Sequence, residues 1–238
     1  MSEIIRFGTD GWRARLDGDF TNDNVVRVAD AAGALWARRA AGALVYVGYD
    51  ARPGAREFAR LAGKVLAAHG LAVKVSDRHV PTPALAWTVA RDDRAVGGLM
   101  VTGSHSPADY QGIKLRMADG GVGSDDFYEE LQRIIDSDPT LARGAIAETD
   151  FLTRYLDHLY AMVDTEAIAA AQLRVVYDPL YGSASGCFAD LLRAMGADVT
   201  EIHGSRDEET DGTHPEPIEP WVDDCEREDR KSTRLNSS

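Results

Sequence analysis

The segment best suited to chemistry is a small polar loop that follows an apolar run. Residues 95–101 read Ala-Val-Gly-Gly-Leu-Met-Val, and residues 102–107 continue Thr-Gly-Ser-His-Ser-Pro. Small and hydroxylated residues let a backbone approach an anion closely, and Ser104 carries a hydroxyl that could act as a nucleophile. Ligands of open α/β sheets gather beyond the carboxyl ends of the strands, so this loop is the first candidate for a site. A polar turn without chemistry is the alternative interpretation.

Two further loops carry residues that suit a phosphate. Residues 7–13 read Phe-Gly-Thr-Asp-Gly-Trp-Arg, in which two glycines permit tight bends and Arg13 offers a planar fork of donors. Residues 48–53 place an Asp and Arg52 at the end of another apolar run. An N-terminal turn with a surface arginine, and an ordinary polar strand end, are the alternatives for these two loops.

Other familiar chemistries find little support in the sequence. Residues 182–186 read Gly-Ser-Ala-Ser-Gly, with Ala184 where the hydrolase elbow G-x-S-x-G needs its serine, and no G-x-x-x-x-G-K-[ST] phosphate loop occurs. The two cysteines, Cys187 and Cys225, lie outside any C-x-x-C spacing, which argues against a thiolate zinc site or a disulfide framework.

Composition limits the class of protein. The chain has 238 residues, 26 Lys+Arg and 39 Asp+Glu, a net charge of −13 and 44% hydrophobic residues. This composition is typical of a globular protein, and an acidic chain without a basic cluster is not expected to bind nucleic acid. No signal-like start and no apolar run of about 18 residues is present, so we expect a cytoplasmic protein that does not enter a membrane. The oligomeric state cannot be predicted.

The acidic residues are concentrated late in the chain. Residues 201–230 hold 12 acidic and 3 basic side chains, a net charge of −9. A solvated acidic segment is the simpler interpretation and a divalent-cation site the sharper one, although the spacing of a Ca²⁺ loop is absent. Residues 231–238, Lys-Ser-Thr-Arg-Leu-Asn-Ser-Ser, differ in composition from the rest and are predicted to be a non-native tail, with the native protein continuing beyond about residue 230.

Along the chain, apolar runs typical of strands alternate with segments that have the period of a helix, and the candidate loops follow these elements. We therefore predict an α/β fold of three-layer α/β/α domains with mixed, mostly parallel sheets. Domain I is predicted to span residues 1–138 and an incomplete domain II residues 149–230, with a linker over 137–148. The predicted strands are residues 43–49, 71–75, 95–101, 112–117, 173–177 and 198–202, and the predicted helices are residues 25–41, 54–69, 82–91, 125–136, 150–163 and 185–195.

Taken together, the loops resemble motifs of the α-D-phosphohexomutase family, the phosphoglucomutases and phosphomannomutases. The family's G-T-x-G-x-R is matched by residues 8–13, its T-A-S-H-N-P by residues 102–107 with Gly and Ser replacing Ala and Asn, and its N-G-x-K by residues 111–114 with Gln111 replacing Asn. Residues 178–182, Asp-Pro-Leu-Tyr-Gly, resemble the D-P-x-x-G that opens its second domain. Four matches in the family's order are far more specific than any one.

The resemblance implies an isomerase of carbohydrate metabolism that interconverts hexose 1- and 6-phosphates through a bisphosphate intermediate. Ser104 would be the phosphoserine, so the protein would be a phosphoprotein. Lys114 would be a catalytic general base, a role that an arginine cannot take because its guanidinium stays protonated. His105 would be a catalytic acid, base or orienting residue.

The resemblance also implies the groups that would surround the phosphate. Arg13, Arg52 and Thr9 would bind the phosphorylated hexose. The metal would be Mg²⁺, held by an oxygen of the phosphate on Ser104 and by the aspartates of a D-G-D-x-D-R loop, and hexose 1,6-bisphosphate would be an activator.

The D-G-D-x-D-R loop is absent from this sequence, and residues 17–19, Asp-Gly-Asp, lie in the wrong place and lack its continuation. The family has four domains, so we expect this chain to be its amino-terminal half, with negligible mutase activity alone. Which hexose is used cannot be predicted, because sugar selection rests largely on the third and fourth domains. A noncatalytic module that binds sugar phosphates is the alternative from another class, and a hydrolase using Ser104 is disfavoured.

Overall fold

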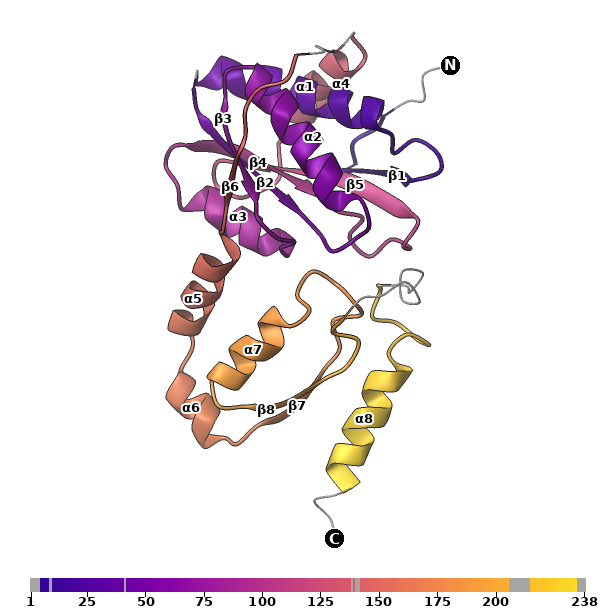
Figure 1. Ribbon diagram of the computed structural model, residues 1–238, viewed down its shortest axis with the longest axis vertical. Coiled ribbons are helices and arrows are strands. Elements are labelled where there is room, and N and C mark those ends of the chain that lie inside the picture. The colour runs from indigo at the N-terminus through magenta and orange to yellow at the C-terminus, as the bar shows by residue number, and fades with distance from the viewer. Residues whose placement is uncertain are drawn as a thin grey trace. The chain divides into compact units, whose positions relative to one another are not determined.

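The chain forms two compact units in the computed structural model, which describes residues 5–8, 10–40, 42–137, 139, 142–205 and 215–234 (Figure 1). The first unit extends to Leu152, except for residues 105–108, which are grouped with the second unit that begins at Thr153. Among the helices of these described ranges, none is long and apolar enough to cross a membrane.

A six-stranded sheet organises the first unit, with strand order β1-β5-β4-β2-β3-β6. Strands β4, β2, β3 and β6 run parallel to one another, whereas β5 is antiparallel to both β4 and β1. The predicted mixed, mostly parallel sheet is therefore confirmed. The strands are β1 (Trp12–Arg15), β2 (Leu44–Tyr49), β3 (Ala72–Ser76), β4 (Ala95–Val101), β5 (Tyr110–Met117) and β6 (Ala147–Thr149).

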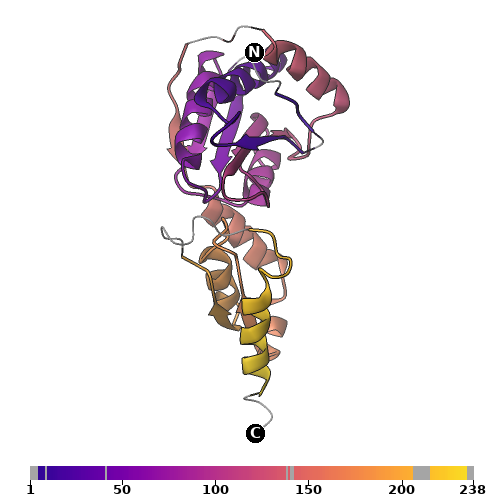
Figure 2. The same ribbon diagram turned by 90° about the vertical axis from the view of Figure 1, so that its right-hand side faces the viewer.

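Helices cover both faces of this sheet. A Cβ added to Gly97 would meet the ring of Trp36, whereas a Cβ added to Gly98 would meet Val89. Consecutive strand residues point to opposite faces, so the helices that carry Trp36 and Val89 lie on opposite sides and the unit has three layers. These helices can be followed in Figure 2. They are α1 (Asn22–Arg39), α2 (Ala55–Ala68), α3 (Thr82–Ala90) and α4 (Asp125–Ile135), with α2 and α4 packed against α1.

Local sequence explains where two of these helices begin. The hydroxyl of Thr21 accepts a hydrogen bond from the N–H of Asn24 at the start of α1, and the hydroxyl of Ser124 accepts one from Phe127 at the start of α4. Each cap satisfies one of the amide groups that the first helical turn leaves without a partner. Valine and alanine side chains of α1 are then buried against the sheet, so the apolar positions of the helical pattern are the ones that form the core.

Two short strands were not predicted. Arg13, expected in a loop, lies in the four-residue strand β1, and part of the predicted linker 137–148 belongs to β6, which pairs with β3. Both strands lie at the edges of the sheet. Residues 12–15 alternate apolar and charged side chains, Trp-Arg-Ala-Arg, but they lie in a segment with two glycines that favoured a loop, and residues 147–149, Ala-Glu-Thr, have no strand pattern. Pairing with a neighbouring strand defines both.

The second unit contains a β-α-β motif. Strands β7 (Arg174–Tyr177) and β8 (Asp198–Glu201) are parallel, and α7 (Cys187–Ala194) connects them, as predicted. Ala189, Ala197 and Val199 form its small core. The other helices are α5 (Leu152–Met162), α6 (Thr165–Ala170) and α8 (Asp223–Arg234), and neither α6 nor α8 was predicted.

Helix α8 bears on the predicted tail. It continues through the first four residues of segment 231–238, and the last four lie outside the described residues. The non-native origin of this segment stays a prediction.

Candidate active site

Ser104 follows β4 and has a backbone conformation that residues other than glycine rarely adopt. Its φ is 56°, in the left-handed region, which is unfavourable for a residue with a Cβ. Hydrogen bonding holds it there, because the N–H of Ser104 donates to Oγ1 of Thr102 over 2.9 Å. The N–H of Thr102 donates in turn to the carbonyl of Gly112 on β5 over 2.9 Å. The sheet therefore fixes the half-buried serine at the carboxyl end of a strand, where strained residues often serve function.

A buried ion pair, Asp50 with Arg52, is hydrogen-bonded to the backbone of this loop. Asp50 and Arg52 are each 8% exposed, and Nε of Arg52 lies 3.2 Å from Oδ2 of Asp50. The same carboxylate oxygen accepts a hydrogen bond from the N–H of Gly103 over 3.1 Å. The guanidinium donates to the carbonyls of Ser104 over 2.9 Å and of Tyr110 over 3.1 Å. Arg52 thus binds the serine loop itself, and its predicted contact with substrate stays a prediction.

Gly103 explains one departure from the family pattern. A Cβ at this position would lie 2.5 Å from Cζ and 2.6 Å from Nε of Arg52. That guanidinium is fixed by the hydrogen bonds just described, so it cannot easily move aside. The packing of Arg52 therefore favours Gly where the family motif has Ala.

Arg13 lies next to the same loop. It pairs with Gly112 in the register of β1 and β5, and a Cβ on Gly112 would come 2.8 Å from Cγ of Arg13 and 2.7 Å from the carbonyl oxygen of Thr102. The side chain is half-buried, and no described residue forms an ion pair or a hydrogen bond with its guanidinium. It is therefore a positive charge available to an anion at the serine loop.

Lys114 lies on β5 and is bound by a carboxylate. Its Nζ is 2.5 Å from Oδ2 of Asp10, while Nη2 of Arg116 is 3.1 Å from Oδ1 of the same residue. The side chains of Lys114 and Arg116 are 9% and 11% exposed, whereas that of Asp10 is 43% exposed. Residues 114 and 116 share one face of the strand with Gly112, so they lie on the same side of the sheet as Arg13.

The charge of Asp10 is stabilised by these two partners. Burial by itself would raise the pKa of the Asp10 carboxyl, but the hydrogen bonds and charges of Lys114 and Arg116 outweigh burial and lower it. Asp10 belongs to a tight turn in which the N–H of Gly8 donates to the carbonyl of Gly11 over 2.9 Å. The carboxylate is thus held between a turn and a strand that are distant in sequence.

The remaining predicted residues have simpler surroundings. His105 follows Ser104 and is exposed, and Thr9 lies outside the described residues. Sequence reasoning did not assign roles to Asp10 or Arg116. A basic residue two positions after Lys114 on a strand was the signal for Arg116, because such residues share a face. Asp10 could not be placed without knowing where the N-terminal turn crosses β5.

A divalent metal ion is not accommodated by the described part of the chain. No group of three or more His, Cys, Asp or Glu side chains there could hold one. The carboxylates near the serine loop already have cationic partners, Asp50 with Arg52 and Asp10 with Lys114 and Arg116. Hard divalent cations need several free oxygen ligands, which these residues do not offer.

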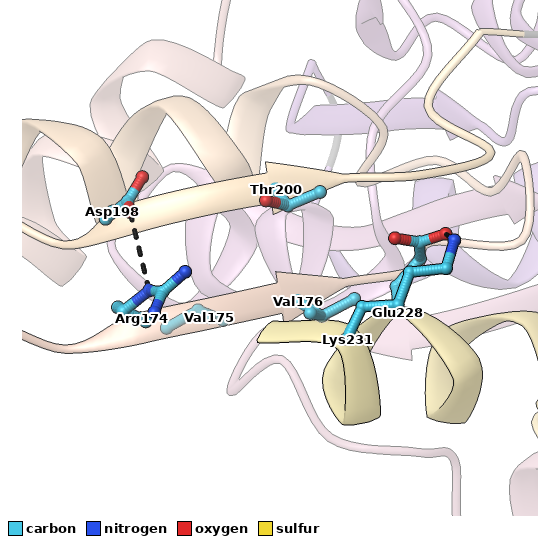
Figure 3. Close-up of a pocket in the computed structure, with 7 residues that line it drawn as sticks. All are labelled: Arg174, Val175, Val176, Asp198, Thr200, Glu228 and Lys231. Carbon is cyan, nitrogen blue, oxygen red and sulfur yellow. Dashed lines mark hydrogen bonds and ion pairs between the residues drawn. The ribbon is translucent and has the colours of Figure 1, made fainter. Parts of the chain in front are cut away.

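A separate cavity of about 250 Å³ lies in the second unit, between the β7-β8 pair and α8 (Figure 3). Its charged groups are paired with each other, since Nε of Arg174 is 3.8 Å from Oδ2 of Asp198 and Nζ of Lys231 is 2.5 Å from Oε1 of Glu228. The cavity therefore shows no charge that is free to select a ligand. Its lining consists of Arg174, Val175, Val176, Asp198, Thr200, Glu228 and Lys231.

Comparison with known families agrees with this geometry. Residues 5–141 match the family described as "Phosphoglucomutase/phosphomannomutase, alpha/beta/alpha domain I", and residues 153–231 match "alpha/beta/alpha domain II" of the same family. The chain belongs to this family. The predicted resemblance and the three-layer α/β/α fold are therefore confirmed.

Individual relatives support the same assignment. The chain is 36% identical over 217 residues to a phosphoglucosamine mutase of Frankia alni, an alignment that covers 84% of this chain and 46% of that protein. It is 33% identical over 141 residues to a phosphomannomutase/phosphoglucomutase of Pseudomonas putida, which covers 59% of this chain and 29% of that protein. The chain thus spans less than half the length of these curated relatives.

A solved structure shares the fold as well as the sequence. The crystal structure of a phosphomannomutase-type protein from Thermus thermophilus superposes with a TM-score of 0.86 at 32% identity. The superposition covers 93% of this chain and 51% of that one. Both units of the chain therefore have counterparts in a family member of about twice the matched length.

Proposed function

We propose that this chain carries the phosphoserine of a phosphohexomutase that interconverts hexose 1- and 6-phosphates. The observation that carries the proposal is the construction of the serine loop. Ser104 is held in a left-handed conformation by Thr102, Asp50 and Arg52. Arg13 pairs with Gly112, next to Thr102 of the same loop, and has no described partner. A serine on a fixed backbone, with a guanidinium that no described residue binds on the adjoining strand, suits the storage and transfer of a phosphoryl group.

The proposed step exchanges one phosphate ester for another. The oxygen of a sugar hydroxyl bonds to phosphorus, and the bond between phosphorus and Oγ of Ser104 breaks. The sugar hydroxyl loses one proton and Ser104 gains one, with His105 and Lys114 as the candidate carriers. Because the transferring group spreads negative charge over its oxygens, nearby cations matter more than covalent machinery.

The position of Lys114 refines its proposed role. A general base must hold no proton when it acts, whereas Nζ of Lys114 faces the Asp10 carboxylate in an ion pair. We therefore assign Lys114 first a cationic role toward the transferring phosphoryl group, with proton transfer following only after the pair has separated. Arg13 would contribute a second positive charge.

The complete activity is a proposal for the whole protein. Mg²⁺, the bisphosphate activator, the choice of hexose and the cytoplasmic location come from the family resemblance. Since the described residues do not fit a metal, its carboxylate ligands are proposed to lie in the family's aspartate loop. We expect negligible turnover of hexose phosphates by the 238-residue chain alone.

Mass spectrometry tests the central claim directly. The product of the complete reading frame at the source locus is incubated with Mg²⁺ and glucose 1,6-bisphosphate, and the peptide that contains Ser104 is weighed. We expect a phosphate adduct that is absent from the Ser104→Ala variant and present in a Ser106→Ala control. An unmodified peptide in a protein that still binds the bisphosphate would overturn the mutase proposal and favour a binding module.

A further inference from the structure

We propose that Asp10 is a positioning residue that holds the cations of Lys114 and Arg116 at the site. This inference deepens the proposed function and rests on it for its role in turnover. The carboxylate uses both of its oxygens, with Oδ2 on Nζ of Lys114 at 2.5 Å and Oδ1 on Nη2 of Arg116 at 3.1 Å. One acidic side chain thus orients two basic ones.

Burial shows why the two cations need such a partner. Lys114 and Arg116 are nearly enclosed, and a long charged side chain without a partner would turn toward water. The other hydrogen bond of the Arg116 guanidinium, from Nη1 to the carbonyl of Leu115 over 3.2 Å, stays within its own strand. Asp10 is therefore the group that orients the ammonium group of Lys114 and the guanidinium group of Arg116 toward the N-terminal turn.

The turn that carries Asp10 is itself fixed against β5. A Cβ on Gly11 would lie 2.4 Å from the carbonyl oxygen of Ile113, and Gly11 has a φ of 118°. The backbone can approach the strand this closely only at a glycine. Two residues later, Arg13 pairs with Gly112. One rigid segment therefore places Asp10 on Lys114 and Arg13 beside the serine loop.

We call the arrangement of Asp10 with Lys114 and Arg116 the Asp10 clamp. A matched pair of variants tests this clamp. Asp10→Asn removes the charge without changing size. Asp17→Asn is the control, because Asp17 is an exposed carboxylate paired with Arg15 over 2.8 Å and has no contact with Lys114. Asp10→Glu keeps the charge and tests rescue.

Lysine labelling reads out the position of Lys114 without any need for mutase activity. The chain has only four lysines, so peptide mass spectrometry resolves Lys114 from Lys64, Lys74 and Lys231, which serve as internal standards. In the 238-residue chain we expect Asp10→Asn to speed reductive methylation of Lys114 by about tenfold, since a charge-assisted hydrogen bond is lost. The other three lysines, and all four in Asp17→Asn, should keep their rates.

Steady-state kinetics of the protein encoded by the complete reading frame then distinguish a positioning role of Asp10 from a role in folding. Misplacement of a charge by about 1 Å can cost 10²-fold in rate, so Asp10→Asn should lower kcat by roughly 10- to 100-fold with KM within about twofold. Asp10→Glu should restore part of kcat. An unchanged Lys114 labelling rate, or an unchanged kcat, in Asp10→Asn would overturn the clamp. If the labelling changes but the wild-type protein has no mutase activity, the proposed function fails while the clamp stands.

Discussion

Replacing Arg52 by Met is the most informative single test of how the serine loop is held. The substitution keeps an unbranched side chain of similar length but removes the guanidinium. Four interactions are affected, namely the ion pair with Asp50, the hydrogen bonds to the carbonyls of Ser104 and Tyr110, and the packing against Gly103. The carboxylate of Asp50 is left buried without its counter-ion.

The magnitude follows from this burial. The side chains of Arg52 and Asp50 are 6% and 10% exposed, so solvent screens their interaction only weakly. Removing one partner of a buried pair costs about 3–5 kcal/mol, a large part of the roughly 5–15 kcal/mol by which a domain is typically stable. We therefore expect Arg52→Met to lower the free energy of unfolding of the first unit by about 4 kcal/mol.

The assay is urea unfolding followed by tryptophan fluorescence, because Trp12, Trp36 and Trp87 all lie in the first unit. The double variant Asp50→Asn with Arg52→Met should recover about 1–2 kcal/mol, since an uncharged amide is cheaper to bury and can still accept from Gly103. Arg78→Met is the control: Arg78 is 52% exposed in its pair with Asp77, so we expect a loss below about 1 kcal/mol. A loss that small for Arg52→Met, or a double variant no more stable than the single one, would refute the reasoning.

The packing of Gly103 and the ion pairs of Asp10 give two more predictions. Gly103→Ala should cost about 1–3 kcal/mol in the urea assay, because its Cβ would lie 2.5 Å from Cζ of Arg52, and the penalty should shrink in an Arg52→Met background; equal penalties in both backgrounds would contradict this. The pKa of Asp10 is lowered in the folded chain, so its carboxylate contributes stability above its unfolded value of 3.8, and this contribution is lost as the pH falls through the lower folded pKa. The stability difference between wild type and Asp10→Asn should thus be constant near neutral pH and shrink below about pH 4, and a difference that grows on acidification would contradict the ion-pair arrangement.

Most of the fold could be predicted because its elements are long enough to show a period. The helix expected at residues 54–69 forms α2 from Ala55 to Ala68, and the strand expected at 95–101 forms β4 with the same bounds. Strands β1 and β6 could not be predicted. Neither contains a continuous apolar run, and both are strands through pairing with β5 and β3, which are distant in the sequence.

The sequence suggested some candidate residues of the site but none of their pairings, and the functional roles of these residues stay predictions. Loop positions after strands suggested Ser104 and Arg52, because ligands of α/β sheets gather there, and the glycine-containing N-terminal segment suggested Arg13. What each cation binds depends on which carboxylate the fold brings near it. Asp10 reaches Lys114 across more than a hundred residues of sequence, and nothing local indicates that contact.

These pairings decide how an acidic chain could bind a phosphate. The net charge of −13 says little, because binding depends on the local field of the site. Four basic side chains lie near the serine loop or on the adjoining face of β5, and the structure gives three of them carboxylate partners: Arg52 with Asp50, and both Lys114 and Arg116 with Asp10. Arg13 is the one of these four without a described partner. In the proposed function, an incoming phosphate would therefore meet Arg13 first, while Lys114 would contribute its charge from the position in which Asp10 holds it. Binding and positioning are thus coupled through the one short turn that carries both Asp10 and Arg13.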